Sequence, residues 1–274
     1  MIGDAAAQKS PDFTNPPLTE VVCGLQFAPI QGWLTSHYGL FWNRIKAEYS
    51  SSEDQPPLPR IALAEFQSPP DFDLAILPPL RRVFYCTEPA NYLVQVQPNR
   101  FLHNWRKLEE SDDYPRFPDA YSRFTKRWSD FRSFLKDSEL MPPAVELYEL
   151  TYVNIIAGSG AIFPRDVWRF MNFYKALPQT ASGADPRALE LTISWPLEEG
   201  RAGRLTMKLK HGVRAIEPQE EAEPLMIVEF NALGSADKDG DNMGQWFKTA
   251  HNAIVYTFAA LTTPEGHRIW GRTA

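Results

Sequence analysis

The chain has 274 residues, of which 43% are hydrophobic, 13% aromatic and 23% charged, and its formal net charge is -6. This composition is typical of a folded globular protein, and it excludes the disordered, collagen-like and membrane-spanning classes. The negative charge disfavours non-specific binding to nucleic acid, although a local basic strip can exist on an acidic protein.

Residues 1–17 are polar, rich in small residues and end in a double proline, so they are predicted to form a flexible arm that docks loosely at best. A secretion signal has a cationic segment followed by an apolar one, and this arm has neither. Cys23 and Cys86 lie in strand-like runs and are predicted to be buried free thiols. These features together predict a cytoplasmic protein.

The first half of the chain, 18–141, alternates strand and helix patterns. The expected elements are a strand at 20–28, a helix with apolar positions from Trp33 to Tyr49, a loop at 50–59, proline-rich loops around short edge strands at 56–79, a hairpin of 81–87 and 91–101, and a helix at 119–140. The last helix carries aromatic residues every three or four positions, which indicates a core face.

The second half, 142–274, repeats this order. Its expected elements are a strand at 146–157, a short helix at 166–174, strands at 189–196, 204–210 and 225–233, and a long helix at 245–261. Antiparallel strands with helices on one face predict an α+β fold. The repeated order predicts two related halves, arranged by topological analogy as a TATA-binding-protein-like pseudo-dimer, and it leaves open whether they form one domain or two.

The main candidate site is a cluster of polar and aromatic side chains in 92–107. It consists of Gln95, Gln97, Arg100, Asn104, Trp105 and Arg106. Strand alternation places both glutamines on the surface opposite the core, where amides beside a guanidinium suit a peptide backbone, a carboxylate or a base edge. The alternative interpretation is a solvated sheet face whose tryptophan covers the edge of the core.

Metal and catalytic patterns are weak. Asp237, Asp239 and Asp241 are spaced like a calcium loop, but Asn242 replaces the required glycine and Lys248 the bidentate glutamate, so a polar loop is favoured and no metal or cofactor is predicted. No recognised catalytic motif occurs. An enzyme with a dispersed site stays an alternative, and a deep pocket that joins His103 or His251 to a carboxylate would support it.

Two further groups are judged structural. The five histidines have no zinc-site spacing, and His251, beside the apolar face of the last predicted helix, is expected to be partly buried. Glu149, Tyr152 and Asn154 interrupt an apolar strand, and Asn154 is expected either to tie that strand to a neighbour, which is favoured, or to line a groove.

Several phrases resemble a sporadically distributed family of bacterial proteins with no assigned activity. They are NPPLTEVVCGLQF, LVQVQPNRFLHNWRK, YPRF and ELTYVNII, and the resemblance runs from Asn15 to about Trp270. It implies a cytosolic prokaryotic protein, distributed like mobile or defence-linked genes, with an immunity, antitoxin or phage-defence accessory role. It implies no enzyme chemistry.

The favoured function is that of a non-enzymatic binding protein that engages a partner protein, encoded nearby, through the 95–106 face. The alternative is nucleic-acid or nucleotide recognition on the same face, with Arg100, Arg106 and Lys107 on phosphate and Trp105 stacked on a base. Homo-oligomer formation is left open.

Overall fold

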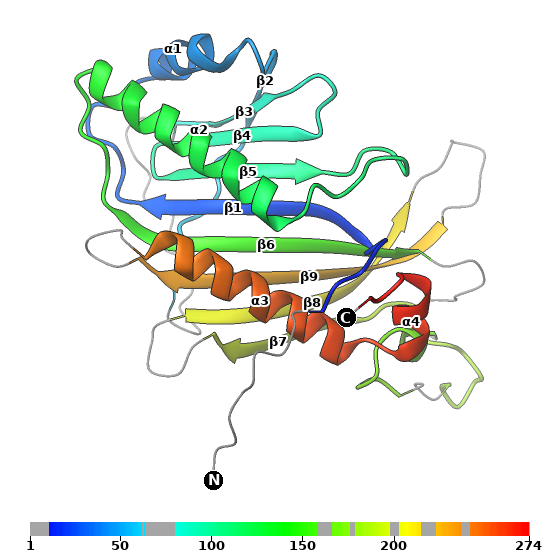
Figure 1. The fold of residues 1–274 in the computed structure, drawn as a ribbon. Helices are drawn as coiled ribbons and strands as arrows, with labels where there is room; N and C mark the ends of the chain where they lie inside the picture. Colours follow the sequence, from blue (N-terminus) through cyan, green and yellow to red (C-terminus); the bar gives the residue numbers. More distant parts are fainter. Residues whose placement is uncertain are drawn as a thin grey trace.

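In the part of the chain that the structure describes, nine strands form one antiparallel sheet with helices on one face (Figure 1). The computed structural model describes residues 11–61, 63, 80–157, 166–175, 179–197, 203–214, 223–236 and 242–273. The strands are β1 (Leu18–Phe27), β2 (Ser51–Gln55), β3 (Arg82–Cys86), β4 (Tyr92–Gln97), β5 (Arg100–Arg106), β6 (Val145–Ala157), β7 (Glu190–Pro196), β8 (Gly203–Arg214) and β9 (Glu223–Ser235). The helices are α1 (Thr35–Ile45), α2 (Phe117–Asp137), α3 (Met243–Leu261), α4 (Pro264–Ile269) and the 3-10 turn η1 (Val167–Arg169). The protein is therefore α+β.

The two halves contribute to the sheet in the same connection order. The strands lie in the order β2-β3-β4-β5-β1-β6-β9-β8-β7, so β1 and β6 meet at the centre, with a meander of four strands beside β1 and one of three strands beside β6. Figure 1 shows α2 over the first half and α3 over the second, both on the same face. A single sheet thus spans both halves, and the pseudo-dimer stays a prediction.

The core lies between this face and the helices, and aromatic rings fill it. Phe131 of α2 packs on Phe101 of β5 with ring centroids 5.2 Å apart. Phe247 of α3 packs against Phe124 of α2, also at 5.2 Å. The aromatic face predicted for the helix at 119–140 is therefore core, and it joins the two helices as well as covering the sheet.

Four expectations about individual segments were wrong. The strand expected at 91–101 is two strands, β4 and β5, separated by a turn at Pro98 and Asn99. Ser51–Gln55, expected as a loop, is an edge strand whose side chains are almost all exposed. Of the helix expected at 166–174, only the three-residue turn η1 forms. The described part of the N-terminal arm, 11–17, is docked: Phe13 packs on Phe258 and Trp270, and the Thr14 amide donates to the Gly271 carbonyl at 3.0 Å.

Both cysteines are buried and free, which confirms the prediction made for them. Burial raises the pKa of both thiols, so they stay protonated. Among the described helices, none is long and apolar enough to cross a membrane.

One close contact between sheet and helix depends on a missing side chain. A Cβ atom at Gly234 in β9 would lie 2.1 Å from Nε1 of Trp246, a buried ring of α3. We expect Gly234→Ala to lower the free energy of unfolding by about 2 kcal/mol, because the indole must move within a packed core. Gly244→Ala is the matched control, since its Cβ would meet only the Tyr121 hydroxyl at 3.6 Å. Urea unfolding of the two variants measures the difference, and equal stability would contradict the prediction.

Candidate functional site

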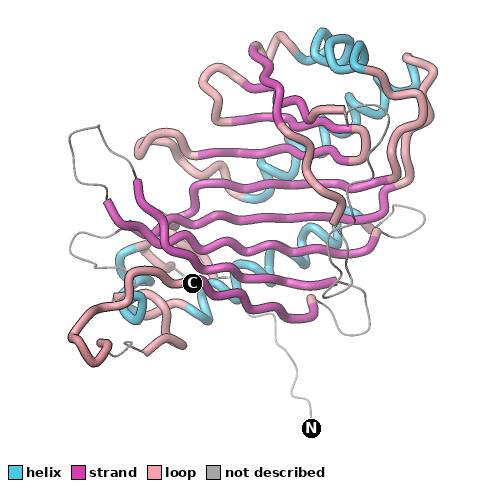
Figure 2. The backbone as a smooth tube through the Cα atoms, turned by 180° about the vertical axis from the view of Figure 1, so that it is seen from behind, coloured by secondary structure: helices cyan, strands magenta, loops and turns pink. Residues whose placement is uncertain are grey.

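The face of the sheet turned away from α2 and α3 is called here the rear face (Figure 2). It carries most of the predicted cluster. Gln97 of β4 is paired with Arg100 of β5, and Leu93 with Asn104, so that Gln95, Gln97, Arg100 and Asn104 share this face. The prediction that the two glutamines point away from the core is confirmed.

The expectation of a solvated surface is wrong for these four side chains. Gln95 is 5% exposed, Gln97 3%, Arg100 6% and Asn104 3%. Trp105 does not join them. Successive residues of a strand alternate between faces, so it points to the helix side, where it is 2% exposed and packs on Tyr114 at 5.4 Å.

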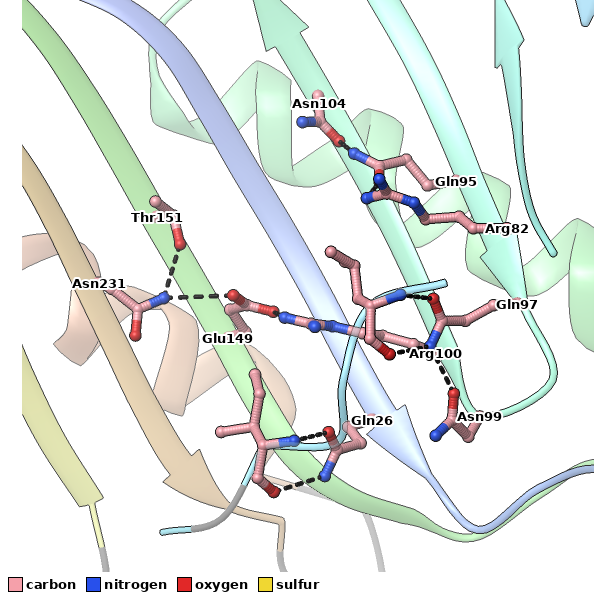
Figure 3. Close-up of polar contacts among 12 residues, drawn as sticks. Gln26, Arg82, Gln95, Gln97, Asn99, Arg100, Asn104, Glu149, Thr151 and Asn231 are labelled. Carbon is pink, nitrogen blue, oxygen red and sulfur yellow. Dashed lines mark hydrogen bonds and ion pairs between the residues drawn. The ribbon is translucent and has the colours of Figure 1, made fainter. Parts of the chain in front are cut away.

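A ladder of hydrogen bonds connects side chains of four neighbouring strands on the rear face. Figure 3 shows its part from Arg82 to Asn104. Arg82 Nη1 donates to Gln95 Oε1 at 2.8 Å, and Gln95 Nε2 donates to Asn104 Oδ1 at 2.8 Å. Asn104 Nδ2 then donates to Glu20 Oε1 at 2.7 Å. Burial raises the pKa of Glu20, and the bond from Asn104 opposes that rise.

An ion pair joins the two halves across β1. The Arg100 guanidinium donates to the Glu149 carboxylate of β6, and the two side chains are 7% and 13% exposed. Gly24 of β1 leaves room between them, since a Cβ there would lie 2.4 Å from Leu102 and 3.1 Å from Glu149 Oε2. Asn231 of β9 donates to Glu149 Oε1 at 3.2 Å, which extends the network into the second half.

Two glutamines hold a stretch of backbone against this face. Gln97 accepts from the Leu58 amide at 2.9 Å and donates to the Leu58 carbonyl at 3.1 Å. Gln26 does the same with Ile61, at 2.7 Å and 3.0 Å. Each side-chain amide therefore satisfies both polar groups of one residue, as a neighbouring strand would.

These backbone groups belong to the crossing segment, residues 56–63, which the structure describes except for position 62. Figure 2 shows it passing over the strands rather than alongside them. Two more contacts hold it: Arg60 Nη2 lies 2.5 Å from Glu146 Oε2, and Arg204 Nη1 donates to the Leu63 carbonyl at 2.9 Å. No sequence pattern indicated this contact beyond the presence of Gln26 and Gln97, because the crossing segment has the composition of a proline-rich loop.

On the helix side, a cavity of about 250 Å³ lies between residues 11–18, the start of α2, and α3. Its described lining includes Phe13, Arg116, Phe117, Tyr152, Asn154, His251, Val255 and Phe258. The cavity was not predicted, because its lining comes from segments far apart in the sequence.

Three of its residues form a hydrogen-bonded chain. The hydroxyls of Tyr114 and Tyr152 lie 3.1 Å apart, and that of Tyr152 lies 2.8 Å from His251 Nδ1. Burial lowers the pKa of His251 to about 4, so the imidazole is neutral at physiological pH. The partly buried position predicted for His251 is confirmed, with its ring stacked on Phe117 at 4.2 Å.

The remaining sequence candidates divide between this cavity and other places. Asn154 Nδ2 donates to the Val228 carbonyl at 3.1 Å, so it ties β6 to β9 and also lines the cavity. Asp12 shares the cavity with His251, which is the pairing that an enzyme would need, but its carboxylate is bound to Arg116 Nη1 at 2.9 Å. His103 lies outside it, hydrogen-bonded to Tyr49.

The aspartates of the calcium-like sequence, Asp237, Asp239 and Asp241, lie outside the described residues. Among those that are described, no group of histidine, cysteine, aspartate and glutamate side chains could hold a metal ion.

Comparison with protein-family models found no match, and comparison with curated proteins found no significant similarity. The resemblance noted from the sequence phrases therefore stays a prediction.

Proposed function

We propose that this protein is a non-enzymatic, cytoplasmic binding protein that holds a partner polypeptide in extended form on its rear face. The observation that carries the proposal is the double hydrogen bond that Gln26 and Gln97 each make to one backbone residue of the crossing segment. Such bonds recognise the polypeptide backbone itself and suit many sequences.

The layout of the sheet supports the same function. Figure 2 shows the rear face without a described helix over it, and the crossing segment covers only one end of the strands. The part that the crossing segment leaves uncovered includes Glu229, which is half-buried, and Lys208, which is exposed. A partner would extend from the two glutamines across this polar surface, or replace the crossing segment on it.

Separating these two modes requires releasing the segment without changing the glutamines. Proline has no amide hydrogen, so Leu58→Pro with Ile61→Pro removes the two backbone N–H groups that donate to Gln97 and Gln26. The side-chain amides of both glutamines stay in place. Gln26→Ala with Gln97→Ala instead removes both side-chain amides, and with them the acceptors and the donors on the sheet. Arg60→Gln is the matched control, because it changes the same segment but keeps both backbone contacts.

We expect a protease that cleaves after proline to cut the double proline variant after Pro59 at least tenfold faster than wild type, since the segment loses two of its four hydrogen bonds to the glutamines. The control should be cut at the wild-type rate. Limited proteolysis followed by mass spectrometry measures this.

The binding test is affinity capture from cells of the source organism, with and without nuclease. A partner that replaces the segment should be captured more by the double proline variant and lost with the double alanine variant. Loss of the captured protein on nuclease treatment, with steep weakening by salt, would replace the proposal with nucleic-acid recognition. Equal capture by all variants would remove the two glutamines from the site.

A further inference from the structure

The cavity beside His251 is the strongest feature that the rear-face function does not use. Its volume of about 250 Å³ exceeds the roughly 150 Å³ in which an apolar cavity holds benzene, so a fused two-ring compound has room. Phe13, Phe117 and Phe258 supply apolar walls, and the imidazole of His251 lies flat on Phe117, with 3° between the two planes. Flat apolar walls favour a planar ligand.

Two polar groups at the cavity have spare hydrogen-bonding capacity. Asn154 is 5% exposed, and within the described chain its Nδ2 is bonded whereas nothing donates to its Oδ1. His251 Nδ1 is hydrogen-bonded to Tyr152, and none of the described residues makes a hydrogen bond to Nε2. When Tyr114 donates to Tyr152 and Tyr152 donates to Nδ1, the proton of the neutral imidazole is on Nε2, which makes it a donor. The cavity then offers one donor and one acceptor.

The charged residues at the cavity neutralise each other. Arg116 Nη1 donates to Asp12 Oδ1 at 2.9 Å and to the Phe13 carbonyl at 3.0 Å. No described lining residue therefore presents an unpaired charge, and a charged ligand would lose its hydration without gaining a partner.

The backbone at Arg116 is strained, which indicates a constrained site. Its φ of 71° with ψ of 155° is a conformation that residues other than glycine rarely adopt. The two bonds from its side chain to residues 12 and 13 hold it there and fix one wall of the cavity.

We propose that this cavity binds a neutral, planar heteroaromatic compound of two fused rings, which accepts a hydrogen bond from His251 Nε2 and donates one to Asn154 Oδ1. Benzimidazole is the probe, because it carries one ring N–H and one acceptor nitrogen. Indole lacks the acceptor and benzoate adds a charge, so both should bind less tightly.

The test is calorimetric titration of the full chain at pH 7.5 with each probe. Val255→Phe fills the cavity from α3, and His251→Phe keeps a ring against Phe117 but removes both nitrogens. We expect each variant to weaken benzimidazole binding at least tenfold. Asn252→Ala, an exposed change on the same helix that does not line the cavity, should leave it unchanged.

The assignment is overturned if wild type shows no saturable benzimidazole binding, or if both cavity variants bind it as wild type does. Equal affinity for indole and benzimidazole would remove His251 Nε2 from the contact and overturn the stated ligand class. Circular dichroism confirms that each variant is folded. If Val255→Phe is not folded, His251→Phe carries the test.

Discussion

Replacing Glu149 with leucine is expected to lower the free energy of unfolding by about 3 to 5 kcal/mol, because it leaves the guanidinium of Arg100 buried and without its carboxylate. The two side chains are 7% and 13% exposed, so water cannot take the place of the lost partner. Asn231 would also lose one of its two acceptors. Urea unfolding measures the change.

The remaining variants of a double-mutant cycle separate the ion pair from the packing around it. Arg100→Met alone should destabilise strongly, whereas Arg100→Met with Glu149→Leu should recover much of the loss, because no uncompensated charge is then buried. Glu146→Ala is the matched control on the same strand. It breaks an ion pair with Arg60 whose side chains are 48% and 35% exposed, and it should cost at most about 1 kcal/mol. Strictly additive losses at Arg100 and Glu149 would contradict the coupling.

Stability is expected to fall steeply as the pH drops below about 6.5. Burial, together with the nearby charges of Arg123 and Arg127, lowers the pKa of His103 to about 3, and burial lowers that of His251 to about 4. In the unfolded chain both imidazoles regain a pKa of about 6.5, so below that pH the unfolded state binds more protons than the folded state. The stabilisation is complete above pH 6.5 and is lost toward pH 4, by about 1.4 kcal/mol per pH unit for each histidine.

Variants that mimic the bonded nitrogen should flatten this dependence. His103→Gln places an amide where Nε2 meets Tyr49, and His251→Asn places one where Nδ1 meets Tyr152. Tyr49→Phe keeps His103 but removes its hydrogen bond, and its pH slope should stay at the wild-type value because burial is the main cause of the shift. Urea unfolding between pH 4 and 8 gives these slopes. A wild-type slope in the His103→Gln, His251→Asn double variant would refute the assignment.

Periodicity predicted most of the sheet and its two long helices because burial leaves a regular pattern along the chain. Alternation in β4 separated Gln95 and Gln97 from Val94 and Val96, and the structure shows them on opposite faces. Periodicity did not predict β2. This exposed edge strand of serine, glutamate, aspartate and glutamine is held by backbone pairing to β3 and buries almost no side chain.

The candidate site was only partly predictable. Trp105 was assigned to the same site as Arg100 because both lie in one polar and aromatic stretch of sequence. The alternation of side chains along β5 would have placed the two residues on opposite faces of the sheet. Other features leave no local signal. Tyr152 and His251 are 99 positions apart, and the bonds to Leu58 and Ile61 use backbone groups that every residue except proline offers. Side chains that act through tertiary contact cannot be found by spacing.

The central place of β1 has a consequence for synthesis on the ribosome. Of the described strands β1 emerges first, yet its neighbours on either side, β5 and β6, end at Arg106 and Ala157. A nascent chain, or a fragment that stops at residue 141, therefore presents one whole edge of β1 with unpaired amide and carbonyl groups. Such an edge is a template for pairing with other chains, so we expect the first half made alone to aggregate until β6 covers it.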